Sequence, residues 1–252
     1  MGKIIAFANQ KGGVAKTTST FNVGSFLAQK GKKVLMIDLD SQASLTISAG
    51  LEPFDLENTI ASVLKKERSR VEDSITPLSE NLDIITSRLE LAQLEMELIG
   101  RSMRETILRR ALASVKGSYD FILIDCPPQL SILTINALSC CDGVIVPVKT
   151  DYLAYRGIEL LMETIGDIKA LINPELEVLG VIATMFEKRS KDDREILDAL
   201  HTNYNVLGVV KKTVEAKKGV YDGLSVAQSA PKNDVAIEYE KVADHIIDKG
   251  DR

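Results

Sequence analysis

Short, uninterrupted apolar runs alternate with longer segments of helical period along this chain of 252 residues. Apolar side chains on successive positions, without polar alternation, are typical of strands that are covered on both faces of a sheet. The runs occupy residues 3–9, 33–38, 82–86, 121–125, 143–148, 176–186 and 204–210. This order of strands and helices predicts an α/β fold with a mostly parallel, twisted sheet, right-handed crossovers and helices on both faces.

The segment after the first run carries a helical pattern that ends at a glycine. Phe21, Gly24, Ser25 and Ala28 fall on one side of this helix, and Gly31 is suited to its C-terminal cap. No internal repeat, low-complexity tract or linker interrupts the chain. We therefore expect a single domain over residues 1–252, with no N-terminal helix-turn-helix domain because the first strand begins at residue 3.

The loop FANQKGGVAKTTS, residues 7–19, lies between the first strand and this helix. A phosphate-binding loop of the pattern G-x-x-x-x-G-K-[ST] would be placed there, but Gln10 and Ala15 stand where that pattern has its outer glycines. Ala15 adds only a methyl group, which fits if its φ is negative. The alternative is a plain glycine turn joined to a helix, with the following lysine solvated.

The mechanism of a phosphate-binding loop survives these replacements. Consecutive backbone N–H groups point into one concavity, and the helix that follows adds the positive end of its dipole. Gly12 and Gly13 supply the permissive backbone, Lys16 supplies a charge for the β- and γ-phosphates, and Thr17 supplies a hydroxyl for Mg²⁺. The sequence therefore favours a nucleotide site.

Carboxylates follow two further apolar runs. Asp38 ends the run at 33–38 and Asp40 lies two residues beyond it, and Asp125 ends the run at 121–125, shortly before two prolines. Ligands of open parallel sheets bind at the carboxyl ends of the strands, where such groups can orient a water molecule or contact the hydration shell of Mg²⁺. Each could instead be a helix N-cap. Two predicted strands that carry carboxylates at their ends, in register with a phosphate loop, favour the nucleotide site over the N-cap role.

Composition narrows the class of protein. The formal charge is −5 and the isoelectric point is near 5.3, so a uniformly basic nucleic-acid coat is excluded and any DNA contact must be local. Cys126, Cys140 and Cys141 lack metal-site spacing and are expected to be buried thiols in a reducing compartment. No signal peptide or membrane-spanning run is visible, which predicts a cytoplasmic protein.

With these motifs in place, the chain resembles the ParA/Soj partition ATPases, the deviant Walker A group related to MinD. The resemblance runs from KIIAFANQKGGVAKTTSTFNVGSFLAQKGKKVLMIDLDSQ through YDFILIDCPPQLSILTINAL to AIEYEKVADHIID. The group's loop reads K-G-G-x-x-K-[ST], so Gln10 is ordinary and Lys11 is the signature lysine. The sequence departs from the family pattern at Ala15, Ser41, Gln129, Ser131 and Lys211.

The resemblance implies an ATPase that binds ATP and Mg²⁺ and forms a homodimer on ATP binding. Lys11 would reach across to the partner's phosphates, Asp40 would position or activate the attacking water, and Asp38 would support Asp40. Thr17 would ligate Mg²⁺ directly, with Asp125 and Asp40 acting through water, and 38–46 and 125–131 would be switch segments. The phosphate contacts would come from Lys11, Gly12, Gly13, Val14, Ala15, Lys16, Thr17 and Thr18, and the adenine contacts from Met185, Lys211 and Thr213.

The resemblance also implies a role in plasmid or chromosome partition, with slow hydrolysis that a ParB-like partner stimulates. It further implies that the ATP-bound dimer binds DNA nonspecifically and associates with the nucleoid. The candidate DNA contacts are Lys188, Arg189, Lys211, Lys212, Lys217 and Lys218. Surface lysines more often only solvate a helix face. A balanced C-terminal segment without a bulky apolar face argues against membrane binding. The alternative is a nucleotide-switched positioning protein for another cargo, MinD-like or cargo-positioning, with little hydrolysis.

Overall fold

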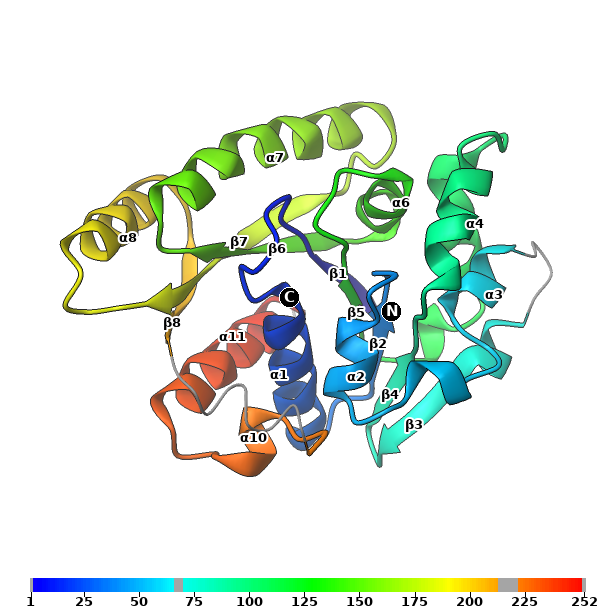
Figure 1. The fold of residues 1–252 in the computed structure, drawn as a ribbon, viewed down its shortest axis with the longest axis horizontal. Coiled ribbons are helices and arrows are strands. Elements are labelled where there is room, and N and C mark those ends of the chain that lie inside the picture. Colours follow the sequence, from blue (N-terminus) through cyan, green and yellow to red (C-terminus); the bar gives the residue numbers. More distant parts are fainter. Residues whose placement is uncertain (1, 66–69, 213–221, 251–252) are drawn as a thin grey trace.

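Eight strands lie side by side in one sheet in the computed structural model, which describes residues 2–65, 70–212 and 222–250 (Figure 1). Their order across the sheet is β3-β4-β2-β5-β1-β6-β7-β8. Every neighbouring pair is parallel except β3 and β4, which confirms the expected mostly parallel α/β fold. The strands are β1 (Lys3–Phe7), β2 (Val34–Asp38), β3 (Ile75–Ser79), β4 (Leu82–Ile85), β5 (Phe121–Asp125), β6 (Gly143–Lys149), β7 (Glu177–Phe186) and β8 (Val206–Lys211).

The apolar pattern missed β3. This edge strand reads ITPLS, contains Pro77 and is only partly buried, so it lacks the continuous apolar run of the other strands. A proline cannot donate a hydrogen bond within a ladder, and it is therefore confined to edges and bulges. β3 pairs antiparallel with β4 across a register shift at Pro77–Ser79, and it closes this side of the sheet.

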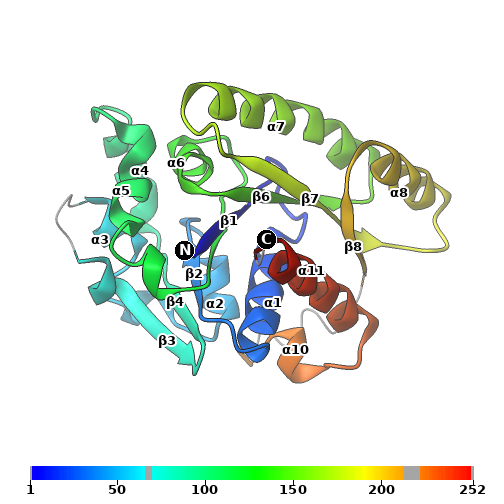
Figure 2. The same cartoon turned by 180° about the vertical axis from the view of Figure 1, so that it is seen from behind.

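Helices cover both faces of the sheet, and each face has its own apolar core (Figures 1 and 2). One layer comprises α3 (Ile60–Lys65), α4 (Glu90–Leu98), α5 (Ile107–Leu112), α6 (Ile132–Cys140), α7 (Tyr152–Leu171) and α8 (Lys191–Asn203). The other comprises α1 (Lys16–Gln29), α2 (Ser44–Ser48), α10 (Val226–Ser229) and α11 (Asp234–Gly250). Short 3₁₀ turns occupy Pro53–Asp55, Val71–Ser74, Arg104–Thr106 and Lys116–Ser118.

Helix α1 lies close against the sheet because one of its positions has no side chain. A Cβ at Gly24 would be 2.8 Å from Sδ of Met36 on β2, so any other residue at this position would require the Met36 side chain to move. The helix ends as predicted: Gly31 has φ 79°, and the N–H groups of Gly31 and Lys32 donate to the carbonyl oxygens of Ala28 and Leu27. This is the hydrogen-bond pattern of a glycine C-cap.

The parallel register brings the chemistry of distant segments to one edge of the sheet. Asp125 at the end of β5 is paired in register with Asp38 at the end of β2 and with Phe7 at the end of β1. The loop after β1 therefore begins beside both carboxylates. Within the described residues, no helix has the length and apolarity needed to cross a membrane.

Candidate functional site

The loop between β1 and α1 forms an open cradle of backbone. A Cβ placed on Gly12 or Gly13 would meet no atom within 4 Å, and Gly13 has φ 72°. The first N–H groups of α1, beginning at Lys16, have no acceptor within their own helix. An anion placed beside the two glycines would meet these donors and the positive end of the helix dipole.

The conformation of Ala15 contradicts the expectation of a negative φ. This N-cap residue of α1 lies in the left-handed region, with φ 63° and ψ 33°. An L-residue there is strained by roughly 1–2 kcal/mol, whereas glycine adopts it freely. The backbone therefore has the shape that a glycine would favour, and the strain of Ala15 is held in place by the surrounding contacts.

Ala15→Gly is expected to raise the free energy of unfolding by about 0.5–1 kcal/mol, because relief of strain exceeds the added entropy of the unfolded chain. ATP affinity should change less than about tenfold, since the phosphate donors are backbone groups. Urea unfolding followed by circular dichroism checks the first statement. The matched control is Ala199→Gly, inside α8, which should lose about 1 kcal/mol. A less stable Ala15→Gly protein would refute the strain assignment.

Two side chains that the sequence did not single out hold the loop in place. The Asn9 side chain donates to the carbonyl oxygen of Pro147 on β6 (2.7 Å) and accepts from the N–H of Lys11 (2.9 Å). The Thr184 hydroxyl on β7 donates to the carbonyl oxygen of Val14 (3.0 Å). Both residues are buried. The loop is therefore fixed to the sheet on the side away from the helix.

Lys16, Thr17 and Asp125 come together as predicted. The Lys16 ammonium is buried and donates to the carbonyl oxygen of Lys11 (3.2 Å), and burial lowers its pKa. The hydroxyl of Thr17 donates to one carboxylate oxygen of Asp125 (2.7 Å), and Thr20 donates to the other (3.4 Å). Burial, with a smaller effect from Asp38, raises the pKa of Asp125.

Asp38 and Asp40 have different surroundings although they are two residues apart. Asp38 is fully buried, and its carboxylate accepts from Thr46 and from the N–H of Asp40. Burial raises its pKa to about 6 despite these donors. Asp40 is half-buried and accepts from the N–H of Gln42 (3.0 Å). Asp38 is thus a structural carboxylate, and Asp40 is the one that remains accessible from solution.

The side chain of Lys11 forms an ion pair with Asp151, a residue that the sequence reasoning missed. Its Nζ atom lies 2.9 Å from Oδ1 of Asp151, which also accepts from the N–H of Ala154 and so caps α7. Burial acts to raise the pKa of Asp151, but hydrogen bonds from Lys11, Ala154 and Lys149 outweigh it and lower the pKa to about 2. The signal was available, because Asp151 lies two residues after the end of β6, at the same edge of the sheet where Asp125 ends β5.

Two of the three residues expected to contact adenine, Met185 and Lys211, lie at the ends of neighbouring strands. Phe186, next to Met185 at the end of β7, is paired in register with Lys211 at the end of β8. Met185 is half-buried and has φ 55°, at a register shift between these strands. Lys211 is exposed, and Thr213 lies outside the described residues.

Four of the six candidate DNA contacts, Lys188, Arg189, Lys211 and Lys212, are exposed, and two of these four are ion-paired. Lys211 contacts Asp234 (2.6 Å) and Lys212 contacts Glu187 (2.6 Å). Lys188 and Arg189 are exposed in the loop between β7 and α8. Lys217 and Lys218 lie outside the described residues.

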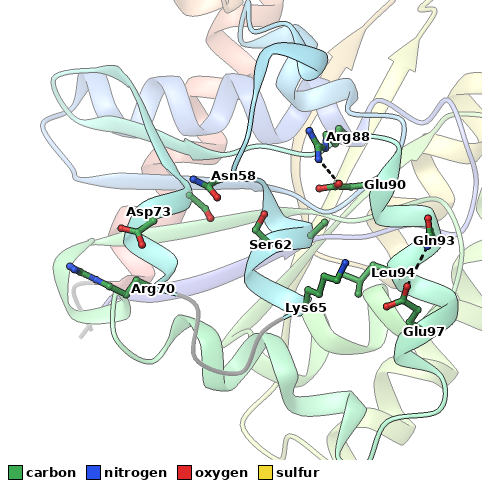
Figure 3. A pocket seen from close by; sticks show the side chains of 12 residues that line it. Asn58, Ser62, Lys65, Arg70, Asp73, Arg88, Glu90, Gln93, Leu94 and Glu97 are labelled. Atoms are coloured by element: carbon green, nitrogen blue, oxygen red, sulfur yellow. Dashed lines mark hydrogen bonds and ion pairs between the residues drawn. The ribbon is translucent and has the colours of Figure 1, made fainter.

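A pocket of about 610 Å³ lies elsewhere, between α3, α4 and the turn at Val71–Ser74 (Figure 3). It carries both signs of charge, including Lys65, Arg70 and Arg88 beside Asp73, Glu90 and Glu97. None of the predicted nucleotide residues lines it. This pocket is therefore not assigned as the nucleotide site, which remains the loop between β1 and α1.

The residues at the loop fit a nucleotide with a divalent cation. Burial lowers the pKa of Lys16 and raises the pKa of Asp125, so it disfavours the charged form of each side chain. A phosphate beside Lys16 and a cation beside Asp125 would favour these charged forms again. Among the described residues, no cluster of three or more His, Cys, Asp or Glu side chains could hold a metal ion alone. Mg²⁺ in phosphate sites normally takes one or two protein ligands, with phosphate oxygens and water. Thr17 and Asp125 would supply such ligands to a bound Mg²⁺.

Comparison with known proteins agrees with this geometry. A family profile described as an AAA domain matches residues 2–178. The sporulation initiation inhibitor protein Soj of Bacillus subtilis is 35% identical, over 99% of this chain and 100% of its own length. The chromosome-partitioning ATPase Soj of Treponema pallidum is also 35% identical, with 98% of each chain covered.

Solved structures share the fold over the whole chain. Cobyrinic acid a,c-diamide synthase from Mycobacterium smegmatis, with bound ADP and magnesium, has a TM-score of 0.86 and 33% identity, covering 100% of this chain and 97% of that one. A putative plasmid partition protein from Borrelia burgdorferi bound to AMPPNP has a TM-score of 0.85 and 27% identity, covering 99% and 100%. The fold, the loop and these relatives together show that the chain belongs to the ParA/Soj family of partition ATPases.

Proposed function

We propose that this protein is a Mg²⁺- and ATP-dependent dimerising ATPase that partitions plasmid or chromosomal DNA. The observation that carries the proposal is the group of buried Lys16, buried Asp125 and half-buried Thr17 beneath an open backbone cradle. Relatives that are named as partition proteins, one of them solved with an ATP analogue, support it. Stimulation of hydrolysis by a ParB-like partner and association with the nucleoid are parts of the same proposal.

Each side chain has a defined task in this mechanism. The backbone of residues 11–18 and the Lys16 ammonium bind the phosphates, and Thr17 and Asp125 hold the cation, which supplies charge neutralisation at the phosphates. Asp40 orients a water molecule for attack on the terminal phosphorus. Its half-buried position and its fixed backbone allow that contact from the solvent side.

Lys11 is the proposed link between hydrolysis and dimerisation. In the single chain its ammonium is held by Asp151, 2.9 Å away. For Lys11 to reach a partner's phosphates, this ion pair must open. A lysine placed between two triphosphates offsets their mutual repulsion and stabilises charge that develops during transfer.

DNA binding is assigned to the edge of the sheet where β7 and β8 end. Lys188 and Arg189 are exposed there, whereas Lys211 and Lys212 each form an ion pair with an acidic side chain. Contacts to phosphate from such side chains release counterions and carry little base preference. Two weak patches joined in a dimer bind DNA far more strongly than one.

Replacement of both Lys188 and Arg189 by Glu is expected to weaken DNA binding equally across sequences. The slope of log affinity against log salt concentration should become less steep by about one unit for each DNA phosphate that is no longer neutralised. ATP should strengthen binding by the unaltered protein. A mobility-shift assay at several salt concentrations measures both effects. The control is Lys169→Glu, at the far end of α7, which should bind DNA normally. A double variant that takes ATP and binds DNA unchanged would remove this loop from the mechanism.

Steady-state ATP turnover with Mg²⁺, with and without DNA, tests the enzymatic half of the proposal. Slow but measurable turnover is expected. ATP binding without any turnover would contradict the ATPase assignment and favour a nucleotide-switched positioning protein.

A further inference from the structure

One buried threonine connects three segments at the nucleotide edge. Thr46, on α2, is fully buried, and both its N–H and its hydroxyl donate to Oδ2 of Asp38 (2.8 Å each). The same hydroxyl accepts from the N–H of Ser87, just after β4 (2.9 Å). One side chain thus joins β2, α2 and the end of β4.

This network determines where the loop 38–46 lies. Asp38 is the last residue of β2, so its backbone is fixed in the sheet. Its carboxylate accepts from the N–H of Asp40 at one oxygen and from Thr46 at the other. The two ends of the loop that carries Asp40 are therefore held by one buried carboxylate.

Beyond this network, the N–H of Leu39 donates to the carbonyl oxygen of Asp125 (3.0 Å) and the N–H of Ala43 donates to that of Asp40 (2.9 Å). Ala43, its residue before α2, has φ 54°, a strained conformation for an alanine. Ser41 is half-buried, and Gln42 is exposed. A strained turn persists only when the surrounding contacts hold it. The hydrogen bonds around Asp38 are contacts of this kind.

We propose that the Thr46 hydroxyl is a positioning group for the hydrolysis reaction, acting through Asp38 to hold Asp40 in place. This inference rests on the proposed ATPase function. Without the hydroxyl, Asp38 loses one donor and the buried N–H of Ser87 loses its acceptor. The loop would then sample positions in which Asp40 does not face the water, and displacements of about 1 Å are enough to reduce turnover strongly.

The test compares Thr46→Val, which keeps the shape but removes the hydroxyl, with Thr46→Ser, which restores it. In Thr46→Val we expect kcat to fall at least about tenfold while ATP affinity stays within about threefold, because the phosphate-binding groups are untouched. Thr46→Ser should recover most of kcat. Thr46→Ala replaces the valine variant if valine prevents folding.

Hydrogen exchange supplies a readout that needs no hydrolysis. Amides of residues 40–46 should exchange about tenfold or more faster in Thr46→Val, while those of α1 do not change. Ser87→Ala, which removes a buried hydroxyl without a hydrogen-bond partner among the described residues, should leave this loop unchanged. Thr59→Val is a matched control at another buried threonine, whose hydroxyl donates to Glu90 and accepts from the N–H of Ala61. The Thr59→Val protein should have an unchanged kcat.

Unchanged exchange in the loop, or faster exchange with an unchanged kcat, would overturn the positioning role. Failure of the proposed function would show differently, because the unaltered protein itself would then not hydrolyse ATP. The two failures are therefore distinct.

Discussion

The Lys16→Ala protein is expected to lose ATP binding, with an affinity at least about 100-fold below that of the unaltered protein. Lys16 is the buried cation beneath the backbone cradle, and alanine at this position leaves no positive side chain there to bind the phosphates. Isothermal titration with ATP and Mg²⁺ measures the loss. Normal affinity in this variant would refute the site.

A control for this change lies on the same helix. Lys30, at the other end of α1, is ion-paired with Glu240 and Asp244 on α11. Lys30→Ala removes an equal charge and should bind ATP normally, because these ion pairs join two helices far from the cradle. A loss of affinity in both variants would indicate damage to α1 rather than removal of a phosphate-binding group.

The Asp40→Ala protein is expected to keep ATP bound, to lose hydrolysis by about 100-fold or more, and to accumulate a dimer. Asp40 is bonded to the loop only through its backbone and the N–H of Gln42, so its removal leaves the phosphate cradle intact. Sedimentation velocity with saturating ATP detects the dimer. Asp55→Ala, on an exposed turn, is the control and should hydrolyse ATP normally.

Lys11→Ala makes the comparison sharper. It should bind ATP but dimerise poorly, because the charge that offsets repulsion between the two triphosphates is gone. An Asp40→Ala protein that remains monomeric at saturating ATP would contradict the sandwich dimer.

The sequence predicted the sheet because its central strands are buried on both faces and therefore read as continuous apolar runs. It predicted the meeting of Thr17 with Asp125 for a related reason: parallel strands carry their carboxyl ends to one edge. It missed β3, whose pattern is interrupted by Pro77 at the edge of the sheet. Local apolar patterns identify strands that are covered, and edge strands are not.

The rest of the site depends on contacts between distant residues. The positive φ of Ala15 is imposed by the folded loop, and an alanine in the sequence gives no sign of it. The pairing of Lys11 with Asp151 joins residues 140 positions apart. Ser131, a departure from the family pattern, accepts from the N–H of Leu133 and caps α6, which explains why a serine suits that position.

The strand order has a consequence for how the protein is made. Among the described residues, β1, the strand that leads into the nucleotide loop, pairs with β5 and β6 and with no other strand, and β5 begins at Phe121. Because synthesis runs from the N-terminus, β1 emerges from the ribosome before β5, and it has no strand partner until the more than 100 residues between them have been made. Its apolar side chains are exposed throughout that interval, which is when such segments aggregate or engage chaperones. The nucleotide loop therefore gains its shape only after β5 and β6 have been made, and ATP can act as a stabilising ligand only for a chain in which these strands have joined the sheet.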